Sequence, residues 1–389
     1  MLTNILEATA GIEPAHSGFA DRRVNQLRHV APYSRIATLP NFAAPGKQAI
    51  LGRMKTLIVA GGKGTRLWPL SKPGQPKQLQ RLLSDKSLLQ DTVARVLPLV
   101  QPTDIYLVVS NEFQVKAVHE QLPDIPTENI LQEPYGRNTA AAVSFGTEHI
   151  IKLHGNDTII VTLWADHFID NPTIFQSGIS QAEKYLTAHP DELVLIGVKP
   201  TYPETGYGYI KFENNTTSDF KKVVAFTEKP SVEFAAQYIL DGNYLWNAGM
   251  FVWRAGTLTQ AFSNHAPQYS NLSNEAYKDI PAISLDDAVL KLSHNLTVLP
   301  LNLGWRDVGH WAALREHFKT NDQQNVAEGK HLTQHSTGNY IVNRSGRTIA
   351  TVGINNLIIV DTDKELLICH PDYAQYVKDI AEEIEKEAD

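Results

Sequence analysis

Short, nearly all-apolar segments alternate with helix-compatible stretches between residues 55 and 198, and this alternation limits the possible folds. The apolar segments are typical of central strands buried on both faces of a sheet; they are residues 55–60, 104–109, 157–164 and 193–198. The stretches between them predict helices over residues 87–97, 111–121, 138–153 and 172–187. This order predicts an α/β protein with an open, Rossmann-like, mostly parallel sheet and helices on both faces. Ligands of such sheets bind beyond the carboxyl ends of the strands.

The pattern changes near residue 330. Glycines at 338, 346 and 353 separate short β-rich runs, and a final helix is expected to begin near Pro371. We therefore expect a main domain over residues 54–329 and a small β-rich module, closed by a helix, over residues 330–389.

The first 53 residues differ from the rest of the chain. They contain six basic and three acidic residues, whereas the whole chain has a net charge of −7. Four prolines interrupt this segment, and at Met54 the sequence changes abruptly to a strand-like run. Two interpretations stay open: Met54 is the real start of the protein, or residues 1–53 form a disordered extension.

Composition excludes several classes of protein. The acidic balance argues against a broad nucleic-acid surface, which would need clustered basic residues. The single cysteine, Cys369, cannot form an internal disulfide, and no apolar run approaches the ~20 residues that span a bilayer. We expect a cytoplasmic protein that binds neither nucleic acid nor a membrane.

A glycine-rich loop follows the first predicted strand. Gly61, Gly62 and Gly64 would let backbone N–H groups approach an anion closely. Arg66 could form paired hydrogen bonds with phosphate oxygens, and Lys77 would add a point charge. Neither the P-loop pattern nor the dinucleotide-binding pattern fits. Such a loop alone could be an ordinary strand-to-helix turn.

The loop, followed by residues 76–77, resembles the signature of sugar-phosphate nucleotidyltransferases, and its segment 67–71 resembles that of the mannose-1-phosphate guanylyltransferases. Six more motifs stand in the order of that family, at residues 133–140, 164–167, 206–210, 228–230, 246–251 and 305–309. The resemblance covers about residues 54–311. It implies a glycosyltransferase-A-like mixed sheet, and the segment after residue 337 resembles a left-handed β-helix-like module of the short, single-function members.

The resemblance implies a reaction between GTP and mannose 1-phosphate. A phosphate oxygen of the sugar would attack the α-phosphorus of GTP and release diphosphate, forming GDP-mannose. Because this nucleophile is already an anion, no general base is needed. Positioning and electrostatics would supply most of the catalysis, with Mg²⁺ or another divalent cation.

The family's catalytic roles fall on five residues. Asp166 and Asp307 would hold the metal, although an aspartate at either place alone would usually cap a turn or a helix. Arg66 and Lys77 would neutralise the triphosphate and the leaving diphosphate, and Lys229 would meet the sugar phosphate. His167 is expected to be structural, and Lys63 to be a solvated surface lysine.

The family's binding roles fall on three groups. The phosphate loop would contribute Ala60, Gly61, Gly62, Gly64 and Thr65. The base or ribose would meet Glu133, Asn138 and Thr139. The sugar would meet Gly208, Glu228 and Asn247. As alternatives, Asn138 and Thr139 could cap the third predicted helix, Gly208 could be a turn glycine, and Glu228 with Lys229 could be a charged strand end.

Some positions depart from the family pattern and leave the substrate preference open. Arg306 and His310 replace small polar residues, and Lys291 stands where glutamate is usual. Three other interpretations remain: transfer to a different sugar 1-phosphate or from a different nucleotide, a catalytically silent nucleotide-sugar sensor, and a structural subunit. A silent sensor would be expected to lack some of the catalytic residues, and this chain keeps them. We expect a homodimer, and no phosphomannose isomerase activity.

Overall fold

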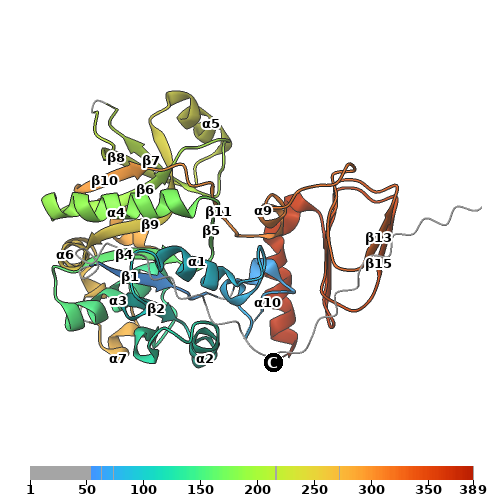
Figure 1. The fold of residues 1–389 in the computed structure, drawn as a ribbon, viewed down its shortest axis with the longest axis horizontal. Coiled ribbons are helices and arrows are strands. Elements are labelled where there is room, and N and C mark those ends of the chain that lie inside the picture. Colours follow the sequence, from blue (N-terminus) through green and yellow to red (C-terminus); the bar gives the residue numbers. More distant parts are fainter. Residues whose placement is uncertain (1–53, 63, 73, 215–216, 271, 389) are drawn as a thin grey trace, which may run out of the picture. The chain divides into compact units, whose positions relative to one another are not determined.

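The structure is a computed structural model that describes residues 54–388 apart from 63, 73, 215–216 and 271 (Figure 1). The two interpretations of residues 1–53 and the expectation for Lys63 therefore lie outside the described residues. Among the helices of the described part, none is long and apolar enough to cross a membrane.

A nine-stranded mixed sheet forms the main domain, in the order β3-β2-β1-β4-β9-β6-β10-β8-β7 (Figure 1). Its strands are β1 (Met54–Val59), β2 (Ile105–Val109), β3 (Ile130–Gln132), β4 (Ile159–Trp164), β6 (Leu193–Val198), β7 (Gly208–Phe212), β8 (Lys221–Glu228), β9 (Tyr244–Arg254) and β10 (Leu296–Pro300). The strands from β3 to β4 are parallel to one another, as are β6 and β10. Strand β9 runs antiparallel between β4 and β6. The predicted α/β class and mixed sheet are confirmed.

Successive side chains of the central strands point to opposite faces of the sheet, and both faces are buried. In β1, Leu57 belongs to one apolar cluster and Ile58 to another, and both are fully buried. Gly146 lets a helix lie close to this sheet, because a Cβ at residue 146 would come within 2.4 Å of Leu57 Cδ1. The nearly all-apolar composition of the predicted strands thus follows from burial on two sides.

Helices cover both faces, as predicted. Side chains of α1 (Leu88–Val96), α2 (Glu112–Gln121) and α4 (Pro172–Ala188) join the first cluster. Side chains of α3 (Asn138–His154) and α6 (Ala255–His265) join the second. The other helices of the main domain are α5 (Val232–Asp241), α7 (Asn274–Tyr277), α8 (Leu285–Ala288) and α9 (Trp311–Arg315).

Two short strands outside the main sheet bring distant parts of the chain together. Strand β5 (His167–Ile169) pairs antiparallel with β11 (Trp305–Asp307), and Asp307 stands opposite His167. This pairing places Asp307 beside the turn that follows β4.

The C-terminal module consists of stacked parallel strands and a last strand, β17, that pairs antiparallel with β16. Its strands are β12 (Val326–Glu328), β13 (His331–Gln334), β14 (Tyr340–Asn343), β15 (Ile349–Val352), β16 (Ile358–Asp361) and β17 (Leu366–Cys369). Residues 18 positions apart pair between successive turns, for example Tyr340 with Ile358. A 3-10 turn at Pro371–Tyr376 leads into α10 (Val377–Ala388), so a helical segment begins at the expected Pro371 but becomes an α-helix only at Val377.

The module packs against the segment that follows the glycine loop. Leu67 and Trp68 share an apolar cluster with Trp311, Val377 and Ala381. Trp311 lies in α9, ahead of the module, and its indole Nε1 donates a hydrogen bond to the carbonyl of Trp68 at 2.8 Å. The module therefore supports the backbone that immediately follows the predicted phosphate-binding residues.

Candidate active site

The glycine loop leaves the carboxyl end of β1 in a conformation that needs glycine. Gly62 and Gly64 have φ angles of 92° and 64°, in the left-handed region. A Cβ at residue 64 would also lie 2.8 Å from Lys77 Cγ. The close approach of Lys77 to the loop therefore depends on Gly64. Thr65 is buried and Arg66 is exposed in the 3-10 turn Thr65–Leu67 that follows.

Lys77 lies between the loop and the predicted metal ligands. Its Nζ is 2.7 Å from Asp166 Oδ2 and donates a hydrogen bond to the carbonyl of Val308 at 3.1 Å. Only 14% of the Lys77 side chain is exposed. Burial disfavours the ammonium, but the carboxylates of Asp166 and Asp307 outweigh burial and raise the pKa of Lys77. The lysine is therefore a fixed, buried positive charge.

The two predicted metal ligands both lie close to Lys77. Burial opposes ionisation of Asp166, but the positive charge of Lys77 outweighs it and holds the pKa of Asp166 below its ordinary value. Asp307 ends β11, and its backbone N–H faces the Tyr207 hydroxyl oxygen at 3.4 Å. Both carboxylates thus border one buried cation that belongs to the chain itself.

The donor set fits a hard divalent cation. Among the described residues, no three histidine, cysteine, aspartate or glutamate side chains are grouped as metal ligands. Mg²⁺ usually takes one or two carboxylates and completes its shell with water and substrate phosphates. Asp166 and Asp307 match that requirement.

His167 has the contacts of a structural residue. Its ring packs edge-on against Trp305, with centroids 5.4 Å apart, and its carbonyl accepts a hydrogen bond from Arg95 Nη2 at 3.1 Å. The strand pair β5–β11 fixes its backbone. These contacts favour the structural interpretation over a metal-binding one.

Glu133 lies behind the glycine loop. Only 4% of the residue is exposed, and Oε1 accepts a hydrogen bond from the Tyr277 hydroxyl at 2.5 Å. Oε2 would lie 3.7 Å from a Cβ at Gly61. Burial raises the pKa of Glu133 to about 7, although the bond from Tyr277 acts in the opposite direction. The Glu133 carboxyl is therefore buried, readily protonated and packed next to Gly61 of the loop.

Asn138 and Thr139 do not cap α3, so that alternative prediction is wrong. Asn138 is the first helical residue and has a left-handed φ of 65°, and its side-chain oxygen accepts the N–H of Thr139 at 2.7 Å. The Thr139 hydroxyl instead accepts the backbone N–H of Leu285, in α8, at 2.9 Å. The two residues therefore join the start of α3 to the segment around α8.

The predicted sugar-side residues gather at the start of β7, at the end of β8 and within β9. Gly208 pairs with Glu228, and a Cβ at residue 208 would lie 2.6 Å from Glu228 Oε2. Lys229 has a left-handed φ of 46°, and its Nζ is 3.1 Å from Glu228 Oε1. Asn247 accepts the N–H of Gly249 at 3.1 Å and donates from Nδ2 to Asp286 Oδ1 at 2.9 Å. Gly208 begins a strand here and is not a turn residue.

Asp286 and Tyr277 contact predicted site residues but were not predicted from the sequence. Asp286 lies in the acidic segment 284–287, close to the position where the family's glutamate is replaced, and that proximity was the available signal. Tyr277 stands in a four-residue helix with no motif, so no sequence signal marks it.

The departures from the family pattern have local partners. Lys291 Nζ is 2.6 Å from Asp287 Oδ1. Arg306 Nη1 donates to the carbonyl of Glu316 at 3.1 Å, and His310 Nδ1 accepts the N–H of Ala313 at the start of α9 at 3.3 Å. None of these contacts involves a predicted site residue.

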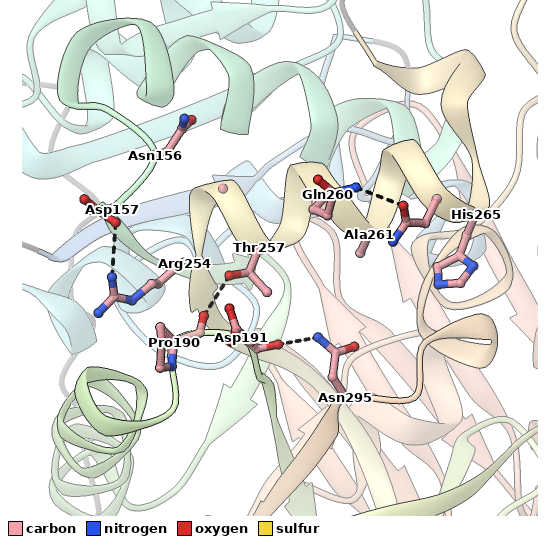
Figure 2. A pocket seen from close by; sticks show the side chains of 12 residues that line it. Asn156, Asp157, Pro190, Asp191, Arg254, Thr257, Gln260, Ala261, His265 and Asn295 are labelled. Atoms are coloured by element: carbon pink, nitrogen blue, oxygen red, sulfur yellow. Dashed lines mark hydrogen bonds and ion pairs between the residues drawn. The ribbon is translucent and has the colours of Figure 1, made fainter.

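A groove of about 360 Å³ lies at the amino-terminal ends of β4, β6 and β10 (Figure 2). Among its lining residues, Asp157, Asp191 and Asn295 precede β4, β6 and β10, whereas the glycine loop and Asp166 follow β1 and β4. Its polar groups are paired with each other: Arg254 Nη1 is 3.1 Å from Asp157 Oδ1, and Thr257 donates to the carbonyl of Pro190 at 2.7 Å (Figure 2). The groove is therefore separate from the candidate active site.

Known proteins resemble this chain over most of its length. It matches the family described as "Nucleotidyl transferase" over residues 55–324 and the "MannoseP isomerase/GMP-like beta-helix domain" over residues 332–384. Mannose-1-phosphate guanylyltransferase of Salmonella muenchen is 34% identical over 352 residues, which are 85% of this chain and 73% of that protein. Alginate biosynthesis protein AlgA of Pseudomonas putida is 33% identical, over 86% of this chain and 72% of that protein.

A solved structure is also similar to this chain over most of its length. The protein described as "mannose-1-phosphate geranyltransferase" from Thermus thermophilus superposes with a TM-score of 0.77 at 31% identity, over 86% of this chain and 99% of that one. The family model covers more than half of the chain, and the relatives share its C-terminal domain as well as its main sheet. The chain therefore belongs to the nucleotidyl transferase family and carries a C-terminal domain of the MannoseP isomerase/GMP-like beta-helix type.

Proposed function

We propose that the chain is a mannose-1-phosphate guanylyltransferase, which converts GTP and α-D-mannose 1-phosphate into GDP-mannose and diphosphate. The observation that carries the proposal is the buried Lys77 ammonium, 2.7 Å from Asp166 Oδ2 and close to Gly64 of the loop. A fixed cation beside two carboxylates suits a reaction between highly charged phosphates. The names of the relatives supply the sugar and the base.

The chain's own cations would bring the two anionic substrates together. Arg66 and Lys77 would bind the triphosphate of GTP and offset the charge on the leaving diphosphate. Lys229 would bind the phosphate of mannose 1-phosphate, so that one of its oxygens faces the α-phosphorus of GTP. That oxygen forms the new P–O bond as the bond to diphosphate breaks, and no proton is transferred.

Asp166 and Asp307 would hold Mg²⁺. When bound, the cation would offset charge on the phosphate oxygens of the reacting group. The carboxylates would keep this charge next to Lys77, so that the triphosphate meets a positively charged region on entering the site.

The remaining predicted residues would orient the substrates. On the nucleotide side they are Ala60, Gly61, Gly62, Gly64, Thr65, Glu133, Asn138 and Thr139. On the sugar side they are Gly208, Glu228 and Asn247. Backbone N–H groups of the loop would face phosphate oxygens, while the polar side chains would meet the base, ribose and sugar hydroxyls.

A matrix of sugar 1-phosphates against nucleoside triphosphates tests the proposal. Diphosphate release should be highest for mannose 1-phosphate with GTP. A higher kcat/KM for another pair would reassign the substrate within the same reaction. No release with any pair, at several divalent cations, would favour the silent sensor or the structural subunit.

We also propose that the chain forms a homodimer. One side of the last helical segment exposes Tyr373, Tyr376, Ile380 and Ile384, and the other side is buried within the subunit. A second copy packed on this row would remove apolar surface from water. Light scattering should give twice the mass of the chain, and Ile380→Glu should give the monomer mass. A monomeric unaltered chain would contradict the proposal.

A further inference from the structure

We infer that Asp286 is a sugar-recognition residue, whose carboxylate accepts a hydrogen bond from a hydroxyl group of the hexose 1-phosphate. The inference rests on the proposed function and deepens it, because it names a residue that binds the sugar. Asp286 was not among the residues predicted from the sequence, and its place in the fold carries the argument.

Asp286 joins a cluster of side chains at the carboxyl end of β8 and within β9. Its Oδ1 accepts a hydrogen bond from Asn247 Nδ2 at 2.9 Å. Burial and, as the second cause, the nearby negative charge of Glu228 raise the pKa of Asp286 to about 6. Glu228 Oε2 in turn lies against Gly208. The carboxylate of Asp286 therefore faces the predicted sugar-side residues.

The chemistry of this cluster calls for a ligand with several O–H donors. Glu228 and Asp286 are both acceptors when ionised, and their proximity is unfavourable without donors between them. Lys229 approaches Glu228 Oε1, and Asn247 approaches Asp286 Oδ1. Further lone pairs on the two carboxylates can accept hydrogen bonds from sugar hydroxyls. A neutral polyol satisfies them without adding charge, which a second anion could not do.

The neighbouring aspartate provides a contrast. Asp287 is half exposed, with Oδ1 paired to Lys291 at 2.6 Å and Oδ2 accepting the hydroxyl of Ser284 at 2.8 Å. Both of its oxygens therefore have partners within the segment around α8. The two residues stand side by side in the chain, and Asp287 serves as the matched control.

The test compares Asp286→Asn and Asp286→Ala with Asp287→Asn. We expect the two Asp286 variants to lower kcat/KM for mannose 1-phosphate by about 10- to 100-fold, the range of a lost hydrogen bond to a charged group. The KM for GTP and the melting temperature should stay close to those of the unaltered chain, which would show that the fold is intact. Asp287→Asn should change each quantity less than about threefold.

Deoxy substrates separate recognition from a structural effect. The 2-, 3-, 4- and 6-deoxy forms of mannose 1-phosphate are each assayed with the unaltered chain and with Asp286→Asn. For the analogue that lacks the hydroxyl bound by Asp286, the two proteins should have the same kcat/KM, while the other analogues keep the difference.

The possible outcomes distinguish the inference from the function. An Asp286→Asn variant equal to the unaltered chain, or one equally impaired with every analogue, would overturn the inference and leave the proposed function standing. Absence of turnover by the unaltered chain with every sugar 1-phosphate would overturn the proposed function and the inference together.

Discussion

The Lys77 ammonium lies 2.7 Å from Asp166 Oδ2 and joins the loop after β1 to the turn after β4. Strands β1 and β4 are adjacent and parallel, so the segments that follow their carboxyl ends bring Lys77 and Asp166 close together. Each charge stabilises the other against the cost of burial, which raises the pKa of the lysine and lowers that of the aspartate. The pair is therefore ready to meet phosphate without a change in protonation.

Gly64→Ala should displace Lys77 and lower kcat/KM by about 100-fold, because a misplacement of about 1 Å can have that effect. A Cβ there would lie 2.8 Å from Lys77 Cγ and 3.1 Å from its backbone nitrogen. Gly74 has a similar positive φ of 81°, but a Cβ at that residue would have nothing within 4 Å. Steady-state assays of Gly74→Ala provide the control, with a change below about threefold. Equal losses in both variants would show that backbone strain, and not the Lys77 contact, sets the rate.

Removal of the metal should abolish diphosphate release, and Asp307→Asn should weaken metal binding. Ligand that binds only the folded state at about 100 times its Kd adds about 2.7 kcal/mol to the free energy of unfolding. Mg²⁺ with GTP should therefore raise the melting temperature of the unaltered chain, measured by calorimetry, by several degrees. The same addition should shift the Asp307→Asn variant much less. An equal shift in both proteins would remove Asp307 from the metal site.

Glu133 should make the free energy of unfolding depend on pH. Its pKa is about 7 in the folded chain and 4.5 ordinarily, so the folded state binds more protons between these values. The contribution is fully present below pH 4.5 and is lost as pH rises through 7, by about 3 kcal/mol at most. Glu133→Gln should therefore gain stability relative to the unaltered chain across this window, measured by denaturant unfolding.

The control for this prediction is Glu128→Gln, which alters an exposed carboxyl in the preceding turn. Its stability should follow the unaltered chain at every pH. A Glu133→Gln curve parallel to that of the unaltered chain between pH 4.5 and 7 would contradict the account.

Trp311→Phe should weaken GTP binding through the contact between α9 and the segment that follows the glycine loop. The substitution removes the hydrogen bond to the Trp68 carbonyl and costs about 1–3 kcal/mol of stability by leaving that group unpaired. Because Trp68 directly follows the turn that carries Arg66, we expect the KM for GTP to rise more than kcat falls. Trp253→Phe is the control: Trp253 is equally buried, and its Nε1 has no hydrogen-bond partner among the described residues. A KM for GTP that rises in both variants would show a general loss of stability.

The sequence predicts the four strands of the main sheet that follow a local pattern. Strands β1, β2, β4 and β6 are short apolar runs bounded by helices, and each lies within two residues of its predicted range. A family motif marks residues 246–251, but no local pattern predicts that β9 is a central strand. Its antiparallel pairing with β4 and β6 depends on contacts between distant segments, which local periodicity does not encode.

Family motifs predict the candidate site residues themselves, but they do not predict the neighbouring residues and strand pairing that hold them in place. Asp166 and Asp307 were named from motifs, but the register that sets Asp307 opposite His167 arises from two three-residue strands. Tyr277 and Asp286 stand in helices of four residues, too short to show a helical repeat. The capping prediction for Thr139 failed because its hydroxyl binds the N–H of Leu285, a residue 146 positions away.

Formation of GDP-mannose by the unaltered chain and by Asp166→Asn tests the central claim most directly. Asp157→Asn is the matched control, since Asp157 precedes β4 and Asp166 follows it. With Mg²⁺, GTP and mannose 1-phosphate, we predict equal amounts of GDP-mannose and diphosphate from the unaltered chain and from Asp157→Asn. Asp166→Asn should lower kcat by at least about 100-fold while the variant stays folded. Near-normal turnover by Asp166→Asn would contradict the account.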